Sequence, residues 1–493
     1  MAALGGKCLR KGPRTTKGSR KTLYEESLYQ NLWLPQAADY KGKGLGRPKG
    51  RGAVCMKKVY IKTFGCQMNE HDAEIMLSRM RSVGYQRVLT PDEADVVLIN
   101  TCSVRDKAYQ KALSEIGRHR KNDRTHPMIL GVTGCVASQE GASIKDRYPH
   151  VDLVVGPDHI KDIDKYISEL TNDSYVVASH FLDKAADQFP MVGDFIPESS
   201  VKAYVTIMKG CNHVCSYCIV PSVRGPEVSR DPEAIIKEIN LLVEKGIKEV
   251  MLLGQNVNSY GRNFGSTIDF TDLVDRIDKE TPVQRLRFAS PHPTNLSQNL
   301  IELYSTSRSL CPHIHLPLQS GSSEVLKKMR RSYTREVYRK KIDQLRKVRP
   351  DVTVTSDIIV GFPGETDAHF EETLAYLKEI QFDNVYAFSY SPRPGTEAAQ
   401  FHDDVPDTVK EERLQILFNL QRDIAYQKNL TRVGCTEEVL VEGESRKGKG
   451  QLTGRTPHNR IVNFYGDHQN RGVIMNVKIK KAHPYSLSGE IHG

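Results

Sequence analysis

The sequence of 493 residues contains no apolar run long enough to cross a lipid bilayer. Its first twenty residues are basic and lack the apolar stretch of a secretory signal. These absences argue against an integral membrane protein and against a secreted one. We therefore expect a soluble protein that acts in the cytoplasm and has no membrane partner. An organelle matrix is the alternative, because the basic segment up to Lys21 has no acidic residue.

An excess of charge is also lacking over most of the chain. Residues 1–56 hold 12 Lys and Arg against 3 Asp and Glu, whereas the remainder holds 58 against 57. The net charge of +10 thus comes from one end of the chain and does not by itself indicate a surface for nucleic acid. The richness of residues 1–56 in Gly, Lys and Arg predicts a disordered basic tail. We assign this tail no catalytic role.

Disulfides are not expected, because cysteines in a reducing compartment stay free and clustered ones more often bind metal. The chain has ten cysteines. Cys8 and Cys55 lie in the tail, while Cys311 and Cys435 stand alone, as single buried thiols commonly do. The other six form two sets of three.

The chain is too long for one ordinary core, and its pattern after the tail divides into parts. Residues 57–172 alternate helical stretches with strand-like runs, which predicts a doubly wound parallel α/β domain. The runs are 59–64, 95–100, 128–133 and 151–155. Residues 173–196 are expected to be a connector.

Two further domains are expected after the connector. Residues 197–429 contain six strand-like runs separated by helices, which is too few for a closed eight-fold barrel and predicts an open, partial (βα)6 barrel. These runs are 204–208, 249–253, 285–289, 313–318, 352–360 and 384–390. Residues 432–493 contain short β runs at 438–441, 460–464 and 472–480, split by Gly-rich turns, and predict a small β-barrel.

The run GCNHVCSYC places Cys211, Cys215 and Cys218 on one loop, directly after an expected strand. Three thiolates so close together can each bind one iron of a [4Fe-4S] cubane. The fourth iron then has no protein ligand and can chelate the amino and carboxylate groups of a small molecule. The alternatives are unrelated thiols, or a structural zinc site with His213 as fourth ligand. Zinc sites commonly use two separated pairs of ligands, which disfavours zinc here.

The second set is recognised by placement. Cys66, Cys102 and Cys135 each stand at the C-terminal end of an expected strand, in TFGC, INTC and VTGC. Ligands collect at that edge of an open parallel sheet, so we expect the three thiols to share one rim. Gly65 and Gly134 allow the backbone to turn tightly around a bulky group. We favour a second cluster with an open iron, which can hold sulfur, over three unrelated buried thiols.

Both sets lie within longer motifs that resemble the methylthiotransferase family of the radical S-adenosylmethionine (radical SAM) superfamily. The motifs follow the family order from residue 57 nearly to the end: KTFGCQMNEHDAE, NTCSVRDKA, GVTGCVASQEG, VDLVVGPD, MKGCNHVCSYCIVPSVRGPEVSR, LLGQNVNSYG, HLPLQSGS, DIIVGFPGET and YSPRPGTEAA. The resemblance implies a methylthiotransferase N-terminal domain, a radical SAM core and a TRAM module. It also implies two [4Fe-4S] clusters, held by the two cysteine sets, and two molecules of S-adenosylmethionine per turnover.

Within this family, GCQMN and RGPEVSR are most similar to the branch that acts on tRNA carrying N6-dimethylallyladenosine. The resemblance implies conversion of this nucleoside, at position 37 of the anticodon loop, to 2-methylthio-N6-dimethylallyladenosine. The branches that act on threonylcarbamoyl-adenosine or on a ribosomal-protein aspartate are alternatives. A non-catalytic RNA-binding protein is disfavoured, because both cysteine sets are intact. The expected partners are the tRNA, a sulfur donor and a reductase or flavodoxin-type electron donor, and we expect a monomer.

Residues at other strand ends are candidates for binding S-adenosylmethionine. They follow the second, fourth and fifth expected strands of the partial barrel, where amides and glycines permit close approach of a ligand, although such residues are usually ordinary loop chemistry. They are Gln255, Asn256, Gln319, Ser320, Gly361 and Gly364.

The C-terminal part holds candidates for RNA contact. The TRAM resemblance implies RNA binding, and residues 432–493 hold 10 Lys and Arg against 6 Asp and Glu. Cations would meet phosphates and an aromatic ring would stack on a loop base, although Phe464 in a β run is more often a core residue. The candidates are Arg455, Arg460, Lys478, Lys480, Lys481, and Phe464 or Tyr465.

Overall fold

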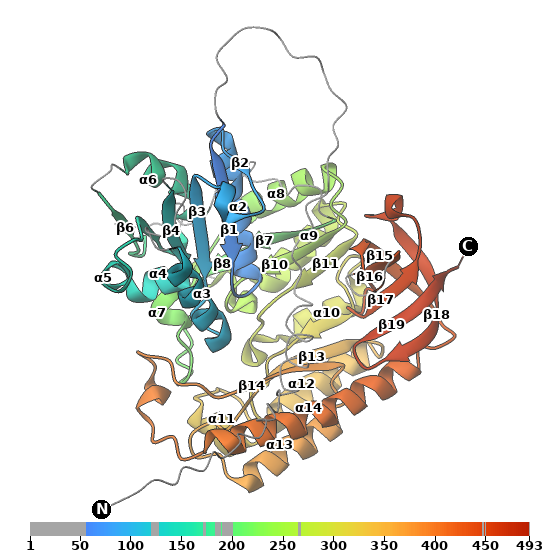
Figure 1. Ribbon diagram of the computed structural model, residues 1–493. Helices are drawn as coiled ribbons and strands as arrows, with labels where there is room; N and C mark the ends of the chain where they lie inside the picture. The colour runs from blue at the N-terminus through green and yellow to red at the C-terminus, as the bar shows by residue number, and fades with distance from the viewer. Residues whose placement is uncertain are drawn as a thin grey trace, which may run out of the picture. The chain divides into compact units, whose positions relative to one another are not determined.

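The computed structural model describes residues 56–119, 128–170, 174–182, 201–264, 268–445 and 450–492, together with Phe189 and Gly448. The predicted disordered tail lies, except for Met56, outside these residues, as does most of the expected connector. The described chain forms an α/β domain, a partial barrel and a small closed β-barrel, in that order (Figure 1). Within it, no helix is long and apolar enough to span a membrane.

The N-terminal domain is built on a parallel sheet of six strands in the order β2-β1-β3-β4-β5-β6. Four of them correspond to the expected runs, whereas β2 and β6 were not foreseen. β6 falls in the expected connector and pairs with β5, so the sheet continues beyond residue 172. The strands are β1 (Lys58–Thr63), β2 (Gln86–Arg87), β3 (Val96–Thr101), β4 (Ile129–Gly134), β5 (Leu153–Val155) and β6 (Val176–Ala178).

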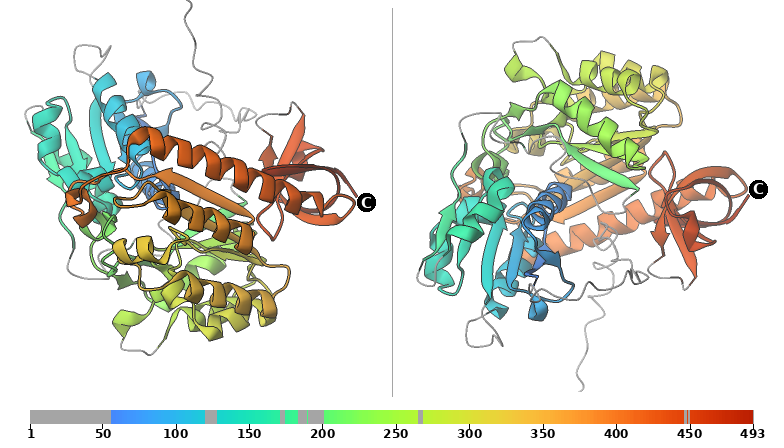
Figure 2. Two further views of the ribbon diagram at one scale, coloured as in Figure 1. Left: turned by 90° about the horizontal axis from the view of Figure 1, so that it is seen from below. Right: turned by 90° about the horizontal axis from the view of Figure 1, so that it is seen from above.

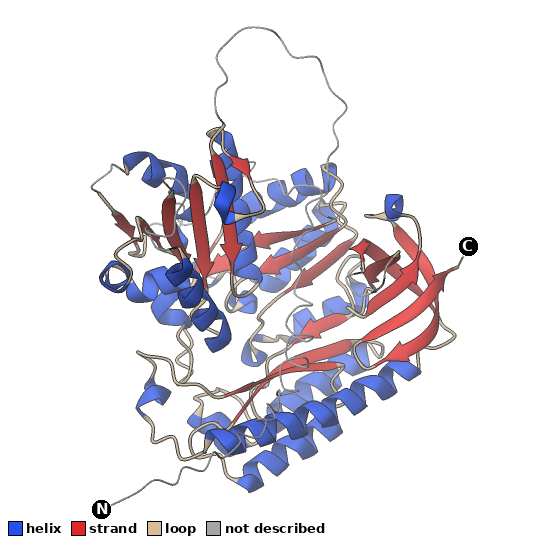
Figure 3. Cartoon of the chain, in the orientation of Figure 1, coloured by secondary structure: helices blue, strands red, loops and turns tan. Residues whose placement is uncertain are grey.

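Helices cover both faces of this sheet, as predicted for a doubly wound domain (Figure 3). β3 is buried along its whole length, with Val96 and Leu98 in one apolar core and Val97 and Ile99 in the other. Such continuous apolar strands are typical of parallel sheets covered on both sides. One face packs α2 (Gln67–Ser82) and α6 (Ile163–Glu169), and the other packs α3 (Asp106–Arg118), α4 (Cys135–Glu140) and α5 (Ser143–Arg147).

The central domain has the six parallel strands expected of a partial barrel. They form two sheets, β11-β10-β7 and β12-β13-β14, which a parallel bridge between Leu286 and Leu310 connects. β7 and β14 are the outer strands of this arrangement. The strands are β7 (Lys202–Thr206), β10 (Glu249–Leu253), β11 (Arg285–Phe288), β12 (His313–His315), β13 (Thr353–Val360) and β14 (Asn384–Ser389).

Capping residues set the starts of the helices that surround this barrel. The carboxylate of Asp231 accepts a hydrogen bond from the Ala234 amide, and Pro232 occupies the first helical position. Ser297, Thr334 and Thr366 cap later helices in the same way. The helices are α8 (Pro232–Glu244), α9 (Phe270–Glu280), α10 (Gln298–Thr306), α12 (Arg335–Val348) and α13 (Asp367–Ile380).

The C-terminal domain is a closed barrel with the strand order β15-β16-β17-β19-β18. The helix α14 (Asp407–Leu430) leads into it from the central domain (Figure 2). Phe464 lies in the barrel core with Val439 and Val477, which rules it out for base stacking in this fold. The strands are β15 (Thr436–Glu444), β16 (Gln451–Arg455), β17 (Ile461–Tyr465), β18 (Ile474–His483) and β19 (Ser486–Ile491).

Charged side chains join the small barrel to the N-terminal ends of the central strands. Arg285, the first residue of β11, pairs with Glu438 at 2.8 Å and donates to the Arg455 carbonyl at 2.8 Å. Arg460 pairs at 3.0 Å with Asp383, which precedes β14. The small barrel therefore covers the strand ends opposite to those that carry the cysteine loops. Arg460, a candidate for phosphate contact, is engaged within the protein.

Arg287 and Glu249 form a buried ion pair at this junction. Nε of Arg287 lies 3.1 Å from Oε2 of Glu249, and the side chains are 1% and 2% exposed. Burial alone would raise the pKa of Glu249, but Arg287, with Lys202 and Arg285, holds it at about 2. Arg287 also donates to the Thr456 carbonyl of the small barrel at 2.9 Å.

We expect Arg287→Met to lower the free energy of unfolding by about 3–5 kcal/mol at pH 7, because it leaves the Glu249 carboxylate buried without its nearest cation. The folded pKa of Glu249, about 2, lies below the ordinary 4.5, so the pair contributes fully above pH 4.5 and less as pH falls toward 2. Denaturant unfolding at pH 7 and pH 4 should therefore show a smaller difference between variant and parent at the lower pH.

The matched control is Arg339→Met, which breaks pairs with Asp343 and Glu379 on the surface. Exposed pairs of this kind contribute about 0–1 kcal/mol. Equal effects of the two substitutions at pH 7 would contradict the role assigned to the buried pair.

Candidate active site: two cysteine triads

Cys211, Cys215 and Cys218 lie together on the loop between β8 (Met208–Lys209) and α7 (Val220–Arg224). The Cys211 amide donates to the Gly225 carbonyl and the Cys218 amide to the Cys215 carbonyl, each at 3.1 Å. Burial raises the pKa of Cys211 to about 11 and that of Cys218 to about 12, and the charge of Cys215 adds to both shifts. Such thiols bind metal with release of their protons, so iron binding would be coupled to deprotonation.

A half-buried arginine, Arg331, lies beside this triad. Nη1 of Arg331 donates to Sγ of Cys215 at 3.3 Å, while Nε donates to the Tyr333 hydroxyl at 2.9 Å. Across the described residues, no three His, Cys, Asp or Glu side chains are close enough to share one metal ion. In a cubane each thiolate binds a different iron, so its sulfurs do not converge on one point. A guanidinium beside the sulfurs offsets the negative charge that such a site carries.

Gly210 and Gln255 fix the backbone at the point where the cysteine loop begins. Gly210 has φ +76°, and a Cβ there would lie 1.9 Å from the Pro226 carbonyl oxygen. Its amide donates to Oε1 of Gln255 at 2.6 Å. Gln255, a candidate for binding S-adenosylmethionine, thus holds the backbone of the loop in place.

We expect Gly210→Ala to destabilise the fold by several kcal/mol and to lower the iron bound per chain, because its methyl would overlap the Pro226 carbonyl. Gly84→Ala is the control: Gly84 has φ +89° but nothing within 4 Å of an added Cβ. The control should lose about 1–2 kcal/mol from backbone strain alone. Thermal unfolding and iron content test this, and equal losses in both variants would contradict the steric explanation.

Cys66, Cys102 and Cys135 meet at the C-terminal rim of the N-terminal sheet, as the strand ends predicted. Cys66 precedes α2, Cys102 follows β3 and Cys135 begins α4. A Cβ at Gly65 would lie 2.6 Å from Cβ of Cys102, so glycine permits the close approach of the two loops. A hydrogen bond from Cys102, opposed by burial, lowers the pKa of Cys66 to about 5. The thiols are therefore near enough to perturb one another.

Three polar residues that the sequence reasoning missed fix this rim. Nδ2 of Asn69 donates to the Thr101 carbonyl at 2.8 Å, and Nδ2 of Asn100 donates to the Asn69 carbonyl at 2.7 Å. The Thr101 hydroxyl accepts from the Val136 amide at 3.2 Å. The signal was present in the sequence, because Asn100 and Thr101 end an otherwise apolar run just before Cys102.

The two triads are connected through α7, the helix that follows the loop of Cys211, Cys215 and Cys218. Cys135 packs with Ile219 and Val223 in one small apolar cluster, and Ile219 is the residue after Cys218. Nε of Arg224, at the end of α7, donates to Sγ of Cys135 at 3.3 Å. The N-terminal rim and the cysteine loop of the partial barrel are thus in direct contact.

Asn256, another candidate for cofactor binding, is buried in a hydrogen-bonded set. Its Nδ2 donates to Oε1 of Glu227 at 2.7 Å, and its Oδ1 accepts from Asn295 at 3.1 Å. Oε2 of Glu227 and Nε2 of both His213 and His292 are buried without a hydrogen-bond partner among the described residues. Polar atoms left unsatisfied beside the cysteine loop fit a place where a polar cofactor binds.

The two histidines stack on each other, with ring centroids 3.9 Å apart and planes at 18°. Burial, followed by the charge of Arg331, lowers the pKa of His292 to about 2. His292 therefore stays neutral at physiological pH. His213, which the sequence offered as a zinc ligand, lies against this ring.

The remaining candidates lie near strand ends and make contacts within the protein. Gln319 has φ +76° and bridges to Ile358 of β13, and the Ser320 hydroxyl lies 3.4 Å from that of Thr373. A Cβ at Gly361 would lie 2.3 Å from Lys410, and one at Gly364 would lie 2.3 Å from Lys328. Lysine side chains thus occupy the space that these two glycines leave open.

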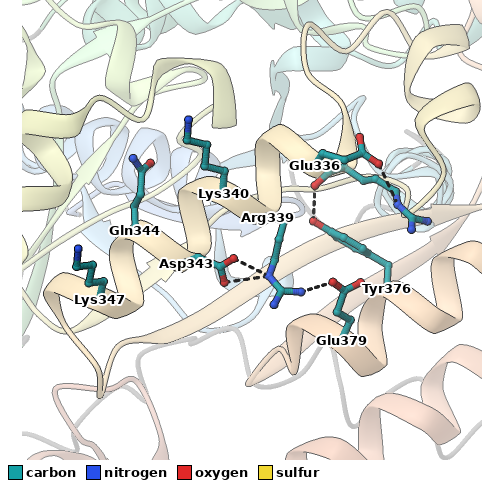
Figure 4. Close-up of a pocket in the computed structure, with 9 residues that line it drawn as sticks. Glu336, Arg339, Lys340, Asp343, Gln344, Lys347, Tyr376 and Glu379 are labelled. Atoms are coloured by element: carbon teal, nitrogen blue, oxygen red, sulfur yellow. Dashed lines mark hydrogen bonds and ion pairs between the residues drawn. The ribbon is translucent and has the colours of Figure 1, made fainter.

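A hollow of about 460 Å³ lies elsewhere, between α12 and α13 (Figure 4). Arg339 reaches across it between Asp343 and Glu379. None of its lining residues is a cysteine or belongs to the N-terminal domain. This hollow is therefore separate from both cysteine triads.

Known families match the three domains in order. Residues 58–156 match the uncharacterised protein family UPF0004, residues 205–377 the radical SAM superfamily and residues 430–492 the TRAM domain. The tRNA-2-methylthio-N6-dimethylallyladenosine synthase of Syntrophobacter fumaroxidans is 45% identical over 90% of this chain and 98% of its own. The chain belongs to the tRNA-2-methylthio-N6-dimethylallyladenosine synthase family. The family's member from Syntrophus aciditrophicus is 44% identical over 88% of this chain and 94% of its own.

Membership of this family confirms the predicted resemblance and the three-part architecture. As a radical SAM protein, the chain uses a [4Fe-4S] cluster and S-adenosylmethionine. Among solved structures, the radical S-adenosylmethionine methyltransferase TsrM from Kitasatospora setae is 13% identical, with a TM-score of 0.49 over 70% of this chain and 75% of its own.

Proposed function

We propose that the chain attaches a methylthio group to C2 of N6-dimethylallyladenosine at position 37 of the tRNA anticodon loop. The observation that carries this proposal is the contact of the two cysteine triads through α7, in a chain 45% identical to a synthase of that name. Two reactive centres in one protein suit a reaction that joins radical chemistry to sulfur transfer.

Each triad offers three thiolates, which is the donor set of a cubane with one open iron. Cys211, Cys215 and Cys218 would hold the first cluster, and Cys66, Cys102 and Cys135 the second, with residues 197–429 as the radical SAM core. Once bound, the clusters and two molecules of S-adenosylmethionine supply the radical and the methylthio group. S-adenosylmethionine bound at the open iron would also need polar partners from the protein. The buried polar atoms of His213 and Glu227, which have no hydrogen-bond partner among the described residues, would provide them.

Apolar and positively charged residues lie beside the triads. Ile219 and Val223 pack against Cys135 in one apolar cluster. Arg331 and Arg224 each donate a hydrogen bond to a cysteine sulfur, so a guanidinium lies beside each triad. An environment closed to water protects a carbon radical from stray hydrogen donors.

We propose that RNA meets the outer face of β18 and the end of β17 in the TRAM domain. Lys478 and Lys480 are exposed while Val477 and Ile479 point into the barrel, the alternation of a strand with one wet face. Tyr465 is 67% exposed and takes the stacking role for which Phe464 is unsuited. Lys481 extends the basic face.

The other partners follow from the reaction. The radical centre requires an electron, for which we propose a reductase or flavodoxin-type donor, and the methylthio group requires a sulfur donor. We place the chain in the cytoplasm as a monomer, with an organelle matrix as the alternative.

Nucleoside analysis of tRNA from a strain lacking this gene tests the proposal. We expect 2-methylthio-N6-dimethylallyladenosine to disappear and N6-dimethylallyladenosine to accumulate, with reversal by the intact gene and not by Cys215→Ala. Unchanged tRNA would refute the proposal. Loss of a methylthio group from threonylcarbamoyl-adenosine would instead identify the alternative branch.

A further inference from the structure

Arg224 lies between the partial barrel and the N-terminal domain. Its side chain is 3% exposed; Nε donates to Sγ of Cys135 at 3.3 Å and Nη2 donates to Oδ2 of Asp72 at 2.7 Å. Its Nη1 is buried and has no hydrogen-bond partner among the described residues. One residue of the partial barrel thereby contacts two helices of the N-terminal domain, α2 and α4.

Burying the Arg224 guanidinium in this way costs free energy unless an anionic group lies beside it. A buried guanidinium requires compensation of its charge and of each N–H group. Asp72 supplies one negative charge, but it leaves Nη1 unsatisfied and Nε directed at a sulfur atom. A cluster bound through Cys135 would place its negative charge beside this guanidinium. The unsatisfied N–H is therefore a feature of this structure that fits the second cluster.

A cationic side chain that donates a hydrogen bond to a cluster sulfur raises the reduction potential of the cluster. Reduction adds one negative charge to the cluster, so hydrogen bonds to its sulfurs and nearby positive charge stabilise the reduced form. A nearby carboxylate has the opposite effect. Arg224 and Asp72 form one ion pair in which the arginine is the member that contacts the sulfur.

We propose that Arg224 is a positioning residue that raises the reduction potential of the cluster held by Cys66, Cys102 and Cys135, and that Asp72 limits this rise. The inference rests on the proposed function, because it requires a second cluster. Arg224 is the first residue of the RGPEVSR motif, so this motif of the partial barrel acts at the cluster of the N-terminal domain. The potential of the N-terminal cluster is thus set partly by a residue that the partial barrel supplies.

The test uses the full chain with Cys211, Cys215 and Cys218 changed to alanine, so that only the N-terminal cluster remains. After anaerobic loading with iron and sulfide, its one-electron potential is measured by mediated titration with electron paramagnetic resonance. Arg224→Gln should shift the reduction equilibrium about tenfold toward the oxidised form, which is about 59 mV. Arg224→Lys, which keeps the charge, should show a smaller shift, and Asp72→Asn should shift the potential upward.

Arg331→Gln is the matched control, since Arg331 is the arginine that donates to a sulfur of the other triad, and it should leave this potential unchanged. Iron bound to every variant with equal potentials would overturn the inference and leave the proposed function standing. Absence of iron in the parent of the series would refute the second cluster itself. If Arg224→Gln does not fold, Asp72→Asn decides: a higher potential supports the inference and an unchanged or lower one overturns it.

Discussion

A chain in which Cys211, Cys215 and Cys218 are replaced by alanine will cleave no S-adenosylmethionine and will methylthiolate no tRNA. These thiols are the ligands that the loop before α7 offers to iron, and the described structure has no other cysteine on that loop. We expect the rate of 5′-deoxyadenosine formation to fall at least about a thousandfold, which corresponds to about 4 kcal/mol in the barrier. Chromatographic assay of 5′-deoxyadenosine and of modified nucleosides measures both losses.

Iron content supplies the second measurement for this variant. It should fall from about eight to about four atoms per chain, because the N-terminal triad keeps its cluster. Cys435→Ala is the control, since Cys435 lies in the TRAM domain and contacts no residue of either triad in the hydrogen bonds of the described chain. Cleavage of S-adenosylmethionine that survives in the triple variant would contradict the assignment of the radical centre.

Cys211, Cys215 and Cys218 could be predicted to lie together because they are close in the sequence, and the other triad because its cysteines follow strand ends. Cys66, Cys102 and Cys135 are far apart along the chain, but each follows an apolar strand, and parallel strands end at one edge. Long buried strands are also the clearest local pattern in a sequence. β3 and β13 were therefore anticipated close to their observed bounds.

The elements that escaped prediction are short or polar. β2 has two residues and β6 has three, so neither produces a hydrophobic period. β16 and β19 contain glycine and small polar residues, which weaken any strand signal. Their pairing comes from the sheets that surround them, and such tertiary context is invisible in a local window.

The roles of single polar residues were the least predictable part of the site. Gln255 and Asn256 were placed correctly at the end of β10, yet their amides bind Gly210 and Glu227 of the protein itself. The contact of Arg224 with Cys135 joins residues of different domains, and no local pattern encodes it. Position along a strand can be read from a sequence, whereas the partner that a side chain chooses depends on the assembled fold.

Replacing Cys66, Cys102 and Cys135 by alanine should separate the two halves of the reaction. The variant should still cleave S-adenosylmethionine, within about threefold of the parent rate, because the loop of Cys211, Cys215 and Cys218 keeps its own support from Gly225 and Arg331. It should form no 2-methylthio nucleoside, because the centre proposed to carry sulfur is gone.

The same pair of assays, 5′-deoxyadenosine release and nucleoside analysis, measures this separation. Thermal unfolding serves as the control, because alanine at Cys135 also removes a contact with Ile219, Val223 and Arg224. Equal loss of both activities in a normally folded variant would contradict the separation, since it would mean that the N-terminal triad is needed for cleavage itself. Release of 5′-deoxyadenosine without methylthio product is the outcome that distinguishes two centres with separate tasks from one composite site.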